Sequence, residues 1–209
     1  MTTTVIRRAA WLVAWDGPAG RHAYLRDADL AFIDDRIVHV GPDFEGEADR
    51  EIDGSGLLVM PGLIDLHSHP SLEPAYKGVR EEHGVPEMYM TGLYERSCAL
   101  RTDDEGALAA AEVAYSELLQ SGVTSLVDVS GAYPGWVDLM GRSGLRGWVA
   151  PWYSSASWKM DNGHTLGFNW NEAAGPAGMT AAEDLMAEAE AHESGRLAGM
   201  YSPGTIDTC

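Results

Sequence analysis

Two histidines separated by one residue, His67 and His69, have the type and spacing that most directly indicate chemistry in this sequence. They follow residues 57–66, an apolar run interrupted by Pro61 and Gly62, which predicts a β-strand. Side chains at positions i and i+2 lie on the same face of a strand, so both imidazoles can converge on one ion. A pair of surface histidines in a turn would have no such role, but the position of this pair after an apolar strand favours a metal site.

The chain from residue 57 onward predicts β-strands that alternate with helices, which is typical of parallel βα units. The four strands are expected at residues 57–66, 123–129, 146–153 and 197–201. Residues 156–178, rich in Gly, Asn and Trp, predict an inserted loop after the third strand. A closed (β/α)8 barrel needs about 250 residues and has its chemistry at the C-terminal ends of its strands. Four units therefore predict an α/β fold that is the first half of a TIM-type barrel, with the histidine pair at its catalytic face.

Capping signals mark the helices that should separate these strands. A helix is expected over residues 103–120, where Thr102 and Glu105 form a possible capping box. Thr180 and Glu183 repeat this signal before a second helix. Strands and helices are therefore expected to alternate through four strands.

Residues 1–58 differ from the rest of the chain in predicted secondary structure, because short β segments are separated there by turn residues. Strands are expected at residues 10–14, 28–33, 36–40 and 50–52. The domains predicted are therefore a small β-sandwich module at 1–58 and the first four βα units of a barrel at 59–209.

Half of a barrel leaves its first and fourth strands as apolar edges, which promote aggregation unless they are covered. We therefore expect a second polypeptide that carries the C-terminal half of the barrel, and a higher oligomer of that two-chain unit. The alternative is a truncated product or a scaffold subunit without catalysis.

Composition and charge exclude several classes of partner. The 209 residues are 45% hydrophobic and 22% charged, so a packed core is expected. A formal net charge of −18 repels phosphate backbones and anionic lipids, so neither nucleic acid nor membrane is expected as a partner. Cys98 and Cys209 are the only cysteines, too few for a disulfide framework, which is compatible with a cytoplasmic protein.

Three segments of the sequence, 29–41, 52–56 and 59–69, together resemble the amidohydrolase superfamily, especially its deaminase and triazine-hydrolase branch. The resemblance implies that His67 and His69 bind one divalent metal ion, zinc or alternatively iron, that activates water for hydrolysis. It also implies further ligands, histidines on the fifth and sixth strands and an aspartate on the eighth, which have no counterpart in these residues. The general base is likewise expected on the other half of the barrel.

Two-metal members of the superfamily bridge their ions with a carboxylated Lys or a Glu from the third or fourth strand. Lys77 and Lys159 are the only lysines, and residues 197–207 contain neither Lys nor Glu. This favours a one-metal site, while Lys159 keeps the two-metal alternative open.

The activity that the resemblance implies is cleavage of a C–N bond, amide or amino, in a small nitrogen-containing molecule. Hydrolytic removal of a halide or thiolate leaving group by the same site is the alternative.

Five further residues are candidates for contacts around the metal or with substrate. Asp128, at the end of the second strand, could hold a metal-bound imidazole by its other nitrogen, or could cap the turn that follows. His83 and His164 lie in segments that could reach over the barrel mouth, or could be exposed loop residues. Trp158 and Trp170 suggest a wall for a planar or apolar substrate.

Overall fold

The computed structural model describes residues 1–77, 101–160 and 165–209, which form two compact units, Met1–Gly62 and Leu63–Cys209. The sequence predicted a boundary after residue 58. The structure places it four residues later, because strand β7 (Leu58–Val59) pairs with strand β2 (Trp11–Asp16) of the first unit.

The first unit consists of two small sheets with the strand orders β5-β4-β1-β6 and β3-β2-β7. Its remaining strands are β1 (Thr3–Ala9), β3 (Arg21–Leu25), β4 (Ala28–Ile33), β5 (Arg36–Gly41) and β6 (Arg50–Asp53). The sequence did not predict β1 or β3. The first of these is a central strand despite its charge, because the Arg7 guanidinium is neutralised by Asp29 at 2.9 Å and Glu51 at 2.7 Å.

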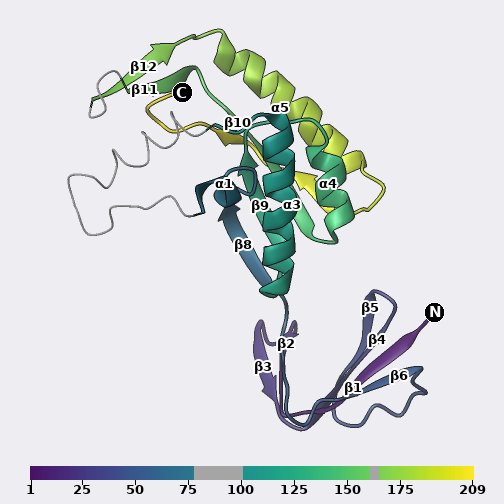
Figure 1. The fold of residues 1–209 in the computed structure, drawn as a ribbon. Coiled ribbons are helices and arrows are strands. Elements are labelled where there is room, and N and C mark those ends of the chain that lie inside the picture. Colours follow the sequence, from purple (N-terminus) through teal and green to yellow (C-terminus); the bar gives the residue numbers. More distant parts are fainter. Residues whose placement is uncertain (78–100, 161–164) are drawn as a thin grey trace. The chain divides into compact units, whose positions relative to one another are not determined.

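The second unit has a parallel sheet in the order β13-β10-β9-β8. Its strands are β8 (Leu63–Ser68), β9 (Val123–Ser130), β10 (Arg146–Tyr153) and β13 (Leu197–Gly199), and β14 (Ser202–Pro203) also pairs with β10. The parallel strands predicted at 123–129 and 146–153 are confirmed, whereas the first predicted strand, 57–66, is divided between β7 of the first unit and β8, and the fourth is split into β13 and β14. The structure thus contains parallel strands with helices, preceded by a β-rich module (Figure 1).

Helices α3 (Asp104–Gln120), α4 (Trp136–Ser143) and α5 (Ala174–Ala191) pack on this sheet, and α1 (Glu73–Tyr76) packs on α3 (Figure 1). Asp103 caps α3 by accepting a hydrogen bond from the Gly106 amide at 2.8 Å, in place of the predicted capping box. Helix α5 begins before Thr180, whose hydroxyl donates to the Pro176 carbonyl within the helix, so that capping prediction is wrong.

The segment predicted as an inserted loop contains an antiparallel hairpin instead. Strands β11 (Ala156–Met160) and β12 (Leu166–Trp170) pair so that Trp158 lies opposite Phe168. Cross-strand aromatic pairs stabilise hairpins, which explains why a segment rich in Gly and Asn still forms strands. Helix α5 then starts within the same segment.

The core of the second unit lies between β9, β10 and the helices. It includes the buried side chains of Tyr115, Leu126, Trp136, Met140, Leu145 and Val149. Strand β8 has the opposite character, because Leu63, Ile64 and Leu66 are 50%, 63% and 75% exposed. None of the helices in the described parts of the chain is long and apolar enough to cross a bilayer.

Because β9 is buried and β8 is exposed, truncating a leucine in each strand should lower the free energy of unfolding of the 209-residue chain by different amounts. Leu126→Ala removes a fully buried side chain and should lower the free energy of unfolding by about 2–5 kcal/mol. Leu66→Ala removes an exposed one and should change it by less than about 0.5 kcal/mol. Urea denaturation of both variants measures the difference, and equal losses would contradict this description of the sheet.

Candidate metal centre

The two histidines singled out by their spacing lie together at the C-terminal end of β8. His67 is in the strand and His69 follows its last residue. Their Nε2 atoms are 3.1 Å apart, and the ring planes meet at 89° with centroids 4.8 Å apart. The two imidazoles therefore present the same nitrogen to a common point in space.

The tautomer of His69 is set by a main-chain oxygen. Its Nδ1 lies 2.6 Å from the carbonyl oxygen of Val129 in β9. Because a carbonyl oxygen only accepts hydrogen bonds, Nδ1 carries the proton, and in the neutral ring Nε2 keeps its lone pair. A neutral imidazole oriented in this way is the form that binds a metal ion.

The geometry of the pair fits a zinc ion. Two nitrogens bound to one zinc ion at about 2.0–2.1 Å and at a tetrahedral angle are about 3.3 Å apart. The separation of 3.1 Å between the Nε2 atoms is close to that value. Among residues 1–77, 101–160 and 165–209, no cluster of three or more His, Cys, Asp or Glu side chains is placed to hold a metal. These residues can therefore supply two ligands of a tetrahedral set.

Asp128 is fully buried at the end of β9, and its carboxylate accepts three hydrogen bonds. Oδ2 accepts from the Tyr115 hydroxyl at 2.5 Å and from Trp136 Nε1 at 2.9 Å. Oδ1 accepts from the Ser130 hydroxyl at 2.5 Å. Of the two roles expected for Asp128, the bond to a metal-bound imidazole is not formed to Nδ1 of His69, which lies against the Val129 carbonyl instead.

Burial changes the ionisation of this carboxyl. Desolvation raises the pKa of Asp128 to about 6, and the hydrogen bonds that it accepts and the nearby His69 oppose that rise. Burial likewise raises the pKa of the Tyr115 hydroxyl well above its usual range. Sequence reasoning missed Tyr115 and Trp136, since each reads as an ordinary core aromatic. The signal that could have found them is a carboxylate in a buried strand, which needs donors from the elements packed on it.

The other candidates are distributed differently. His83 and His164 fall outside the described residues. Lys159, the residue that would support a two-metal site, lies in β11. Trp170 is exposed in β12 beside Phe168, with ring centroids 6.2 Å apart. Trp158 lines a cavity.

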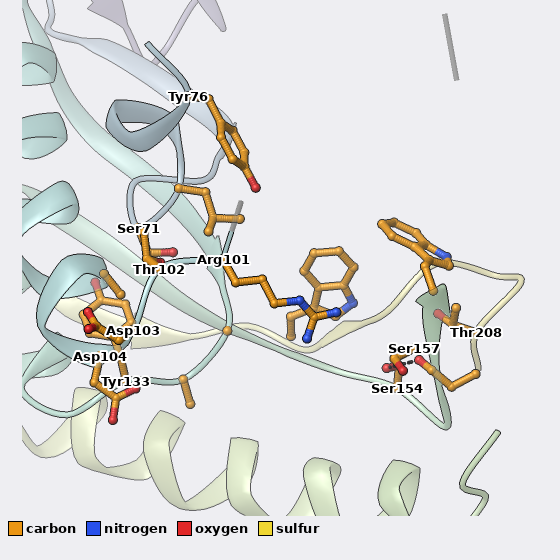
Figure 2. Close-up of a pocket in the computed structure, with 17 residues that line it drawn as sticks. Ser71, Tyr76, Arg101, Thr102, Asp103, Asp104, Tyr133, Ser154, Ser157 and Thr208 are labelled. Carbon is orange, nitrogen blue, oxygen red and sulfur yellow. Dashed lines mark hydrogen bonds between the residues drawn. The ribbon is translucent and has the colours of Figure 1, made fainter. Parts of the chain in front are cut away.

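That cavity, of about 340 Å³, lies where β8, β9 and β10 end. Residues that follow or end these strands line it, among them Ser71, Tyr133 and Trp152. Figure 2 shows the Arg101 side chain extending across it, with the hydroxyls of Ser154, Ser157 and Thr208 on the far side. The rings of Trp152 and Trp158 meet edge to face with centroids 5.9 Å apart. The cavity thus combines aromatic walls with polar groups, as small-molecule sites do.

Comparison with known proteins identifies similar chains, although no family model matches. The chain is 25% identical over 207 residues, 98% of its length, to the 5'-deoxyadenosine deaminase of Methanosarcina acetivorans. The structure matches a triazine hydrolase from Arthrobacter aurescens (TM-score 0.72, 18% identity, all of this chain) and an atrazine chlorohydrolase from Arthrobacter aurescens TC1 complexed with zinc (TM-score 0.70, 20% identity, 98% of this chain). The chain spans only 43%, 48% and 47% of these three proteins, respectively.

Because the pKa of Asp128 is raised, the free energy of unfolding of the metal-free wild type should change with pH relative to that of Asp128→Asn. The folded carboxyl titrates near pH 6 and the unfolded one near 3.8, so its contribution to stability is complete below about pH 4 and is lost as pH rises through 6. Relative to the Asn variant, the free energy of unfolding of the wild type should fall by about 1 kcal/mol between pH 5 and pH 7.5. Urea denaturation at both pH values measures this, and a difference that stays constant or grows with pH would refute it.

Proposed function

We propose that this chain, which belongs to the deaminase and triazine-hydrolase branch of the amidohydrolase superfamily, supplies two metal ligands to a hydrolase that cleaves a C–N bond in a small nitrogen-containing molecule. The observation that carries the proposal is the pair of Nε2 atoms 3.1 Å apart at the end of β8. The Val129 carbonyl supports it, because it leaves the Nε2 lone pair of His69 available.

His67 and His69 would hold one divalent ion, with zinc as the leading candidate because a structural relative is described as complexed with zinc. When bound, such an ion acts as a Lewis acid and makes water nucleophilic at neutral pH. The chain's own contribution is to hold the two Nε2 atoms aligned on a common point.

The cavity at the ends of β8, β9 and β10, which is lined by Ser71 and not by His67 or His69 themselves, suits a planar substrate. Its aromatic residues, Trp152 and Trp158, can contact a ring, and Arg101 and the carboxylates of Asp103 and Asp104 can pair with polar substituents. The similar proteins are named as deaminases or hydrolases of nitrogen heterocycles. Deamination of such a ring is therefore the leading reaction, and the chlorohydrolase relative favours loss of a halide as the second.

The remaining metal ligands and the general base are proposed to come from polypeptide outside these 209 residues, on a second chain. The exposed apolar side chains of β8, from Leu63 to Leu66, support this, since an edge strand of that kind is stabilised by a covering strand.

Loss of either histidine should remove the metal. In the purified protein with its completing polypeptide, His67→Ala or His69→Ala should lower bound zinc from about one ion to below about 0.1 per chain, because a three-ligand remnant binds weakly. Elemental analysis by mass spectrometry measures this, and His22→Ala in strand β3 of the first unit is the matched control. Unchanged zinc content in both site variants would refute the proposed site.

A completing polypeptide should be detectable in the native protein. Native mass spectrometry should give a complex heavier than the 22.5 kDa of this chain by a second component of similar size, and zinc and hydrolytic activity should accompany that complex. A heavier complex without metal or activity would favour the scaffold alternative. A 22.5 kDa monomer that holds zinc and is active without a second component would contradict the proposed second chain.

A further inference from the structure

We propose that Asp128, acting through the hydroxyls of Ser130 and Ser71, is a positioning residue that fixes the imidazole of His69 for metal binding. This inference rests on the proposed function, because it concerns the same metal site. It assigns a role to three buried polar residues, none of which binds the metal in that proposal, although Ser71 also lines the cavity.

The direction of the hydrogen bonds follows from the chemistry of the groups. The ionised Asp128 carboxylate can only accept, so the Ser130 hydroxyl gives it its single proton at 2.5 Å. The Ser130 oxygen is then left to accept, and the Ser71 hydroxyl donates to it at 2.9 Å. We call this chain of hydrogen bonds, Ser71 to Ser130 to Asp128, the hydroxyl relay. All three residues are buried, so water does not compete for these bonds.

The carboxylate at the end of the hydroxyl relay is itself held from two helices. Tyr115 of α3 and Trp136 of α4 both donate to Oδ2, while Oδ1 receives the Ser130 proton. Both oxygens are therefore engaged, and the carboxylate plane is fixed. A rigid acceptor gives the relay a defined end point rather than a mobile one.

The other end of the hydroxyl relay is two residues from the metal ligand. Pro70, between His69 and Ser71, is also buried, and the His69 carbonyl accepts from the amides of Leu72 and Glu73 at 2.9 and 3.0 Å. The main chain around His69 is thus folded into a turn. Moving Ser71 would displace that turn, and the imidazole with it.

Two hydrogen bonds join the segment 69–71 to the end of β9. The Ser71 hydroxyl bonds to Ser130, and His69 Nδ1 bonds to the carbonyl of Val129, the residue between Asp128 and Ser130. One link anchors the main chain of the turn, and the other orients the ring. Together they hold Nε2 in place, whereas the ring-to-carbonyl bond alone would leave the turn free to shift.

A role in packing alone is a poor explanation of the hydroxyl relay. A buried carboxylate is costly, and apolar residues of similar volume would fill the same space without that cost. Directional hydrogen bonds add a defined position, which a metal ligand requires.

The test uses Ser71→Ala, Ser130→Ala and Asp128→Asn in the complete protein, with Ser125→Ala as the matched control. Ser125 is buried in the same strand and takes no part in the hydroxyl relay. The first readout is the affinity for Co²⁺ alone, followed by its visible absorption. The relay variants should bind Co²⁺ about tenfold or more weakly, the range expected when a partner behind a metal ligand is lost, while Ser125→Ala stays within twofold.

The second readout needs no metal and reports the ring directly. The ¹⁵N chemical shifts of His69 in the metal-free protein should indicate protonated Nδ1 in the wild type and in Ser125→Ala, and a mixture of tautomers in the relay variants. Thermal unfolding accompanies both readouts, and the comparison uses the relay variants that remain folded. If only one of the two serine variants folds, the affinity and tautomer of that variant determine whether the hydroxyl relay positions His69.

The outcomes separate this inference from the proposed function. If wild-type protein binds Co²⁺, His69→Ala abolishes binding, and the relay variants match the wild type in affinity and tautomer, the positioning role is overturned alone. If wild-type protein does not bind Co²⁺ through His69, the proposed function fails, and the tautomer measurement still decides whether the relay orients the ring. Weakened affinity with a changed tautomer supports both.

Discussion

The hydrogen bond between His69 Nδ1 and the Val129 carbonyl is the constraint on which the site depends. It joins the end of β8 to the end of β9 and fixes which nitrogen of the ring is protonated. Without it, the neutral imidazole could present either nitrogen, and convergence with His67 would be one arrangement among several. Parallel pairing of the two strands brings the carbonyl to the ring, so the fold itself supplies the orientation.

The end of β9 also contains the energetically unfavourable feature of the site, a buried carboxyl group. Asp128 is buried with its pKa raised by desolvation, and it is tolerated because Tyr115, Trp136 and Ser130 satisfy its oxygens. The apolar core around it is formed by β9, β10 and the helices, while β8 leaves its apolar side chains exposed. The ligand-bearing strand is therefore well anchored on its β9 side and uncovered elsewhere. This asymmetry is what a sheet continued by further strands would remove.

Sequence patterns predicted the local parts of this arrangement and missed the long-range ones. Strands β9 and β10 were located within a residue because their apolar runs are continuous, and the convergence of His67 and His69 follows from strand alternation. Strand β1 was missed because Arg7 breaks its apolar pattern, and its partners Asp29 and Glu51 are distant in sequence. The start of α5 was missed because Gly175 and Pro176 read as loop residues, although proline is tolerated in a first helical turn.

The hydrogen bonds that hold His69 could not be predicted from the sequence either, because their partners are distant in the chain. The hydroxyl relay joins residues about sixty positions apart, and only strand pairing brings them together.

X-ray absorption spectroscopy at the zinc edge, on the complete protein with and without the His69→Ala change, measures whether the imidazoles at the end of β8 bind the ion. Imidazole nitrogens are expected at about 2.0–2.1 Å from the ion in the wild type, with the imidazole signal diminished or the zinc lost in the variant. Zinc whose coordination is identical in both proteins would contradict this assignment, because the His69 ring would then hold no metal.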